Sequence, residues 1–184
     1  MKMKSVKGPI YLIGYMGAGK TTVGRLLAEQ LGWHFVDLDE AFREIHSIST
    51  ADYIRQYGIE AFRRKEKYVL EDIADMAPYD NVIYATGGGY PCWEDNMECL
   101  SELGTSVYLR WTAEDLAKRL MLTDLSERPV LQGRTEEELV EFIRPQLEAR
   151  EEYYLQADHT LDAPGFSEDA DALLADRLYA LMRA

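Results

Sequence analysis

Short apolar runs alternate with amphipathic segments along the whole chain of 184 residues. The apolar runs predict five strands, at residues 9–14, 34–37, 81–86, 106–111 and 158–162, of which the first reads as buried. Between these runs, apolar residues recur at helical spacing. Because strands that alternate with helices form parallel sheets covered on both faces, the pattern predicts a three-layer α/β/α fold around a five-stranded parallel sheet.

Start and stop signals place the helices. The spacing of apolar residues predicts helices at residues 22–31, 51–57, 59–77 and 167–183, the first two ended by Gly32 and Gly58. Thr112 and Thr135 each stand three residues before a carboxylate, as in capping boxes, and predict two more helices. Pro145 either kinks the second of these or begins a new helix at its first turn.

The residues between strand 9–14 and helix 22–31 predict the first piece of chemistry. Residues 14–21 read Gly-Tyr-Met-Gly-Ala-Gly-Lys-Thr and fit the phosphate-binding loop Gly-x4-Gly-Lys-[Ser/Thr]. Such a loop aims backbone amides at phosphate oxygens, and the following helix adds its positive end. Lys20 is expected to reach the β- and γ-phosphates and Thr21 to hold Mg²⁺. The chain is therefore expected to be a P-loop NTPase-type protein that binds a nucleoside triphosphate.

Composition limits the remaining classes of function. A length of 184 residues suits one domain, residues 1–184, and no apolar run approaches the ~20 residues of a membrane-spanning helix. A net charge of −13 argues against nucleic-acid binding. We expect a cytoplasmic monomer that binds small molecules, contacts neither nucleic acid nor membrane, and uses Cys92 and Cys99 as packing thiols.

Two carboxylates follow the second predicted strand. Strand alternation predicts that Asp37 and Asp39 point to the same side, at the sheet edge where ligands bind. One carboxylate near a phosphate loop can organise Mg²⁺, and the other can accept a proton from an attacking hydroxyl. The alternative is that the pair only caps the next helix.

Three further patterns carry weaker signals. Arg63 and Glu66 share a helical face, either as a surface pair or as part of an anion site, which the neighbouring cations favour. Residues 87–89 are three glycines after a strand, either a flexible turn or bare backbone that something approaches closely. Arg128 stands in a predicted mobile lid, approximately residues 121–135, and Arg150 is either a binding residue or solvated.

Together and in this order, these motifs resemble the shikimate kinase family. The resemblance covers about residues 9–165 and includes the phosphate loop, Asp-x-Asp, Phe-Arg-x-x-Glu, the glycine triplet, Arg-Pro-Val-Leu in the lid, and an arginine before an aromatic pair. It implies transfer of the γ-phosphate of ATP to the 3-hydroxyl of shikimate, with Mg²⁺, in chorismate and aromatic amino acid biosynthesis.

The resemblance also implies a role for each residue that matches a family motif. Lys20, Asp39 and Arg128 would be catalytic, and Thr21 and Asp37 would organise the metal. ATP would be bound by Gly17, Ala18, Gly19, Lys20, Thr21, Thr22, Arg119, Arg128 and Pro164. Shikimate would be bound by Asp39, Arg63, Glu66, Gly87, Gly88, Gly89 and Arg150.

Two other functions remain open from the residues alone. A sister kinase of the same fold would phosphorylate gluconate, which is also a hydroxylated carboxylate, or a nucleoside monophosphate. A nucleotide-dependent switch would turn over no small molecule, but the Asn-Lys-x-Asp pattern for guanine is missing, since neither Asn81 nor Asn96 precedes a lysine.

Overall fold

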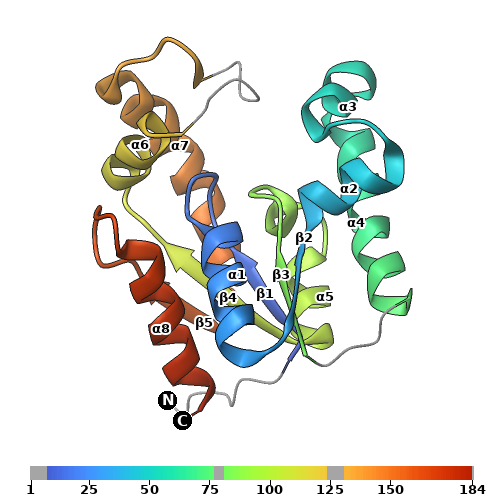
Figure 1. Cartoon of the computed structure of the whole chain (residues 1–184). Coiled ribbons are helices and arrows are strands. Elements are labelled where there is room, and N and C mark those ends of the chain that lie inside the picture. The colour runs from blue at the N-terminus through green and yellow to red at the C-terminus, as the bar shows by residue number, and fades with distance from the viewer. Residues whose placement is uncertain (1–7, 77–80, 124–130, 184) are drawn as a thin grey trace.

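The computed structural model describes residues 8–76, 81–123 and 131–183 and shows a five-stranded parallel sheet (Figure 1). Every strand pairs parallel to its neighbours, in the order β2-β3-β1-β4-β5. The strands are β1 (Ile10–Ile13), β2 (His34–Asp37), β3 (Val82–Ala85), β4 (Thr105–Arg110) and β5 (His159–Asp162). The predicted sheet is confirmed, with each strand boundary within one residue of the expected one.

Helices cover both faces of this sheet, which confirms the three-layer architecture. Along β1, Ile10 and Leu12 enter the apolar core that includes α1 and α8, whereas Tyr11 and Ile13 enter the opposite core beside α5. The helices are α1 (Lys20–Leu31), α2 (Leu38–His46), α3 (Thr50–Tyr57), α4 (Ile59–Met76), α5 (Asn96–Leu103), α6 (Ala113–Met121), α7 (Glu136–Tyr154) and α8 (Ala170–Met182), with a short 3₁₀ helix, η1 (Tyr90–Cys92).

A third, smaller core joins the helices beside β2. Phe42 of α2 packs edge-on against Tyr53 of α3 and Phe62 of α4, with ring centroids 5.2 and 5.1 Å apart. Helices α2, α3 and α4 therefore form one helical arm at one side of the sheet (Figure 1). Helices α6 and α7 pack together at the other side.

The helix signals in the sequence are largely confirmed. Gly32 ends α1 in the left-handed conformation, with φ of 66°, and Thr135 forms the full capping box with Glu138. Pro145 lies inside α7, so a new helix at this residue is wrong. The last helix begins at Ala170 rather than residue 167. Within the described ranges, no helix is long and apolar enough to span a bilayer.

Candidate active site

The phosphate loop connects the buried strand β1 to the first turn of α1. Gly17 and Gly19 have φ of 81° and 84°, a region that disfavours side chains, so the turn requires glycine there. Lys20 folds back over the loop, and its Nζ donates hydrogen bonds to the carbonyls of Gly14 and Tyr15, at 2.8 and 2.9 Å. Its ammonium group therefore stands at the loop, where it can meet phosphate oxygens.

A cavity of about 240 Å³ opens over this loop. Arg119 lines it, and so do two threonines of α1 and the carboxylates of the β2–α2 turn. Pro164 lies on the exposed segment after β5 and is not among the lining residues. The lining residues are Met16, Gly17, Gly19, Lys20, Thr21, Thr22, Asp37, Asp39, Thr86, Gly88, Arg119 and Thr123.

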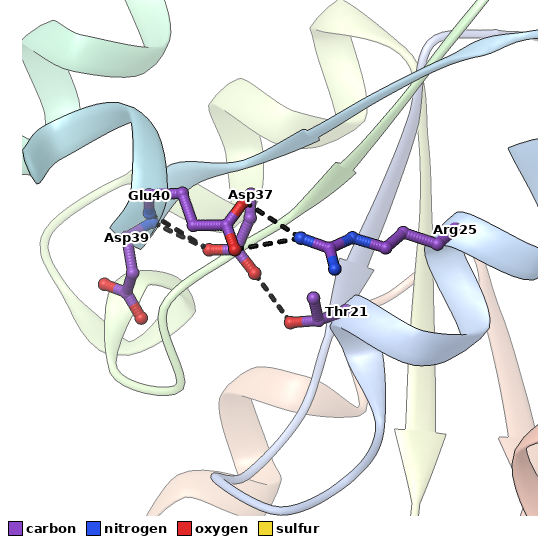
Figure 2. Close-up of polar contacts among 5 residues, drawn as sticks. All are labelled: Thr21, Arg25, Asp37, Asp39 and Glu40. Atoms are coloured by element: carbon purple, nitrogen blue, oxygen red, sulfur yellow. Dashed lines mark hydrogen bonds and ion pairs between the residues drawn. The ribbon is translucent and has the colours of Figure 1, made fainter. Parts of the chain in front are cut away.

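Asp37 connects the phosphate loop to α2, as Figure 2 shows. The Thr21 hydroxyl donates to Asp37 Oδ2 at 2.6 Å, while Asp37 Oδ1 accepts the backbone amides of Asp39, at 3.0 Å, and Glu40, at 3.4 Å. Asp37 is thus the N-cap of α2, as the alternative interpretation expects, and it is also the partner of Thr21. Its part in organising Mg²⁺ stays a prediction.

The expected alternation of Asp37 and Asp39 along a strand is wrong. Strand β2 ends at Asp37, and Asp39 belongs to the first turn of α2. The helical turn directs the Asp39 carboxylate away from the Thr21–Asp37 pair (Figure 2). The two carboxylates consequently occupy separate places in the site.

The Thr21–Asp37 pair has the chemistry of a Mg²⁺ site. Both groups present hard oxygen atoms, and Mg²⁺ is usually held by one or two protein oxygens together with phosphates and waters. Among the described residues there is no cluster of three or more acidic, histidine or cysteine side chains that would form a metal cage. The donor set therefore fits a magnesium ion that arrives with a nucleotide.

A second cavity, of about 500 Å³, lies between the helical arm, the glycine triplet and α7. All seven residues expected to bind the acceptor line it, and Asp39, Met16 and Gly88 line the first cavity as well. Its lining residues are Met16, Asp39, Thr50, Ala51, Ile54, Arg55, Phe62, Arg63, Glu66, Gly87, Gly88, Gly89 and Arg150. Asp39 therefore stands where the two cavities meet.

Arg63 and Glu66 form a buried ion pair, so the alternative of a surface pair is wrong. Arg63 Nη1 donates to Glu66 Oε2, and the two side chains are 14% and 2% exposed. Burial raises the pKa of the Glu66 carboxyl to about 7, although the Arg63 guanidinium acts in the opposite direction. Glu66 Oε1 has no hydrogen-bond partner within the part of the chain that the structure describes.

The glycine triplet makes room for this ion pair. A Cβ atom at Gly87 would collide with Glu66 Oε1, and one at Gly89 would collide with the Arg63 guanidinium. Tyr154 of α7 holds the segment in place, since its hydroxyl donates to the Gly88 carbonyl at 2.5 Å. The close approach expected at this bare backbone is thus made by two side chains of the protein itself.

Arg150 enters the same cavity from α7. Its guanidinium lies over the Tyr15 ring, 5.2 Å from the centroid, rather than extending into solvent. Arg63 and Arg150 thus bring two positive charges to one cavity of an acidic protein. Such an arrangement suits a small carboxylate ligand.

The comparisons with known proteins address the family directly. The family model described as shikimate kinase matches residues 16–176. The chain belongs to the shikimate kinase family.

Individual relatives agree with this membership. A shikimate kinase from Parabacteroides distasonis is 43% identical over 162 residues, which are 88% of this chain and 91% of that protein. The crystal structure of shikimate kinase from Bacteroides thetaiotaomicron is 34% identical, with a TM-score of 0.85 over 95% of this chain and 98% of that one. Shikimate kinase from Acinetobacter baumannii in complex with shikimate is 32% identical, with a TM-score of 0.79 over 95% and 92% of the two chains.

Arg128 and residues 124–130 of the expected lid lie outside the described residues. Sequence reasoning missed the cavity residues of α3, although Thr50 and Ile54 are four positions apart on one helical face. It also missed Trp111 and Asp171, which contact Arg119 beside the phosphate loop and show no motif.

Proposed function

We propose that this chain transfers the γ-phosphoryl group of ATP to the 3-hydroxyl of shikimate, giving 3-phosphoshikimate and ADP. The observation that carries the proposal is the position of Asp39 on the boundary between the phosphate-loop cavity and the cavity that contains Arg63 and Arg150. An acceptor held in the second cavity by its carboxylate presents its hydroxyls towards the first. The family and the geometry thus support the same reaction.

The proposed mechanism relies on positioning and charge neutralisation, as phosphoryl transfer does in general. Arg63 and Arg150 bind the shikimate carboxylate, and Asp39 accepts the proton of the 3-hydroxyl as its oxygen bonds to the γ-phosphorus. The bond between that phosphorus and the β–γ bridging oxygen breaks, and ADP leaves with the electron pair. Lys20 and the loop amides neutralise the charge on the phosphates.

The remaining groups bind and orient the metal ion and the nucleotide. We propose that Thr21 and Asp37 hold Mg²⁺, which shields phosphate charge when bound. Gly17, Ala18, Gly19 and Thr22 bind the phosphates through the backbone and first turn of α1. Arg119 and Pro164 remain predicted contacts of the adenine, and Arg128 of the phosphates. We further propose that residues 1–184 act as a monomer of one domain with a lid at about 121–135.

The test is ADP release from Mg-ATP by the purified protein, with shikimate, gluconate or a nucleoside monophosphate as the acceptor. We expect shikimate alone to stimulate release strongly. Turnover with another acceptor instead would contradict the assignments of Asp39, Arg63 and Arg150. The assignment of the phosphate loop to ATP binding would stand. Tight ATP binding without turnover of any acceptor would favour a nucleotide-dependent switch.

A further inference from the structure

Two side chains from the β4–α6 region donate hydrogen bonds to backbone carbonyls of the phosphate loop. Arg119 Nε donates to the Gly17 carbonyl at 2.6 Å, and Trp111 Nε1 donates to the Ala18 carbonyl at 3.0 Å. A phosphate loop works only when its amides face the anion and its carbonyls turn away. Because Arg119 and Trp111 bind two successive carbonyls, these carbonyls are not free to turn towards an anion in the loop.

Arg119 is itself held in place from two sides. Its guanidinium lies over the Trp111 ring, 4.4 Å from the centroid. Its Nη2 donates to both carboxylate oxygens of Asp171, at 2.8 and 3.0 Å. The Arg119 and Asp171 side chains are only 15% and 18% exposed, so solvent screens this pair less than a surface pair.

Asp171 comes from the first turn of α8, 52 positions along the chain from Arg119. It also touches the loop, because a Cβ atom at Gly19 would collide with Asp171 Oδ1. The last helix of the fold therefore reaches the phosphate loop through one carboxylate. The Asp171 carboxylate also holds Arg119, which in turn binds the loop.

A carboxylate beside an anion-binding loop has two opposed effects. Its negative charge repels phosphate, whereas its hydrogen bonds fix Arg119 and, through Arg119, the Gly17 carbonyl. The guanidinium lies within hydrogen-bond distance of the carboxylate, so the two charges largely cancel for a phosphate farther away. The positioning effect should then exceed the repulsion.

We propose that Asp171 is a positioning residue for nucleotide binding, which fixes Arg119 against the Gly17 carbonyl and so holds the phosphate loop ready for a triphosphate. The proposal rests on the proposed function only in that the loop binds phosphates. It requires no contact between Asp171 and the nucleotide. It also gives α8 a direct part in binding the phosphate donor.

The test compares Asp171→Asn with a matched control, Asp176→Asn. Asp176 lies on the same helix and loses the same charge, but its carboxylate accepts from Gln30 and is remote from the loop contacts of Arg119. Calorimetry would give the Kd of ADP and of inorganic tripolyphosphate, and steady-state kinetics the KM for shikimate. We expect Asp171→Asn to weaken both phosphate ligands about tenfold, the size of one charge-assisted hydrogen bond, and to leave the KM for shikimate unchanged. Asp176→Asn should change none of these values.

Arg119→Lys shows whether Asp171 acts through Arg119. Lysine lacks the Nε–H that holds the Gly17 carbonyl, so Asp171→Asn should have little further effect on tripolyphosphate binding in this background. If Asp171→Asn does not fold, Asp171→Glu takes its place, because it displaces the carboxylate by one methylene without removing its charge.

Three results would overturn the proposal. Unchanged or tighter tripolyphosphate binding in the Asp171 variant would show that repulsion matters more than positioning. An equal loss for shikimate would show a general structural defect. Full additivity with Arg119→Lys would show that Asp171 acts by another route. The binding measurements need no turnover, so a failure of shikimate phosphorylation is seen separately.

Discussion

The position of Asp39 is set by the first turn of α2. Asp39 follows the N-cap Asp37 by two residues, and this turn carries its carboxylate to the boundary of the two cavities while Asp37 remains with Thr21. Neighbouring acidic residues of similar chemistry thereby receive different proposed tasks. In the proposed mechanism Asp39 accepts the proton, and Asp37 would help to hold the metal.

Replacement of Asp39 by asparagine should therefore affect the chemical step. The variant keeps the size of the side chain but cannot take the proton, so kcat should fall by roughly 10²–10⁴. The Kd of ADP and the thermal midpoint should stay close to those of the wild type. A variant that retains kcat would show that another group, or water, accepts the proton.

Glu66 should make stability depend on pH in an unusual direction. Its folded pKa of about 7 lies above the 4.5 of an unperturbed carboxyl, so the folded state holds an extra proton between these values. The contribution of Glu66 to the free energy of unfolding is therefore greatest below pH 4.5 and is lost as the pH rises through 7.

Urea unfolding of the wild type and of Glu66→Gln at several pH values would measure this contribution. Glutamine has no carboxyl to titrate, so the wild type should lose stability relative to the variant between about pH 5 and 8. A constant difference between the two proteins over this range would contradict the raised pKa.

At the scale of elements, the glycine triplet provides the bare backbone against which the Arg63–Glu66 pair of α4 packs. Gly89 has φ of −101°, which alanine adopts without strain, so any effect of Gly89→Ala comes from its new methyl group. That methyl group would push the Arg63 guanidinium out of its position. We expect the KM for shikimate to rise about tenfold, as for one lost charged contact, and the KM for ATP to change little.

The comparison of the two KM values is the measurement for Gly89→Ala. A rise in both KM values would mean that the segment moves as a whole and carries the Tyr154–Gly88 contact with it. Gly87→Ala provides a second variant on the same segment, because its methyl group would meet Glu66 instead of Arg63.

The strands and helices could be predicted from the sequence because their signals are local. The strands β1 and β3 are continuous apolar runs, Gly32 and Thr135 mark helix ends, and the phosphate loop is a contiguous motif. The burial of Glu66 was not readable, since it depends on how α4 meets the glycine triplet. Asp171 was not readable either, because nothing near it in the chain indicates contact with Arg119.

At the scale of the whole molecule, nucleotide binding should raise the free energy of unfolding. A ligand at about 100 times its Kd adds about 2.7 kcal/mol to the free energy of unfolding. For a chain of this length that corresponds to a rise of roughly 5–10 °C in Tm. Lys20→Ala should lose most of this rise with ADP, because Lys20 supplies a positive charge at the loop.

Thermal scans with and without Mg-ADP would test the role of Lys20. The matched control is Lys118→Ala, which removes a half-exposed lysine of α6 whose partner is Asp115 of its own helix, and it should keep the full rise. A full rise in the Lys20 variant would show that the backbone of the loop alone accounts for phosphate affinity.

The helical arm has a consequence for how such an enzyme changes over evolutionary time. Asp39, Arg63 and Glu66 stand on α2 and α4, which have a small core of their own built on Phe42 and Phe62. The phosphate loop stands on a different core, shared by α1 and α8. Selection can therefore remodel the arm for a new acceptor while the apparatus that handles the phosphate donor is inherited unchanged.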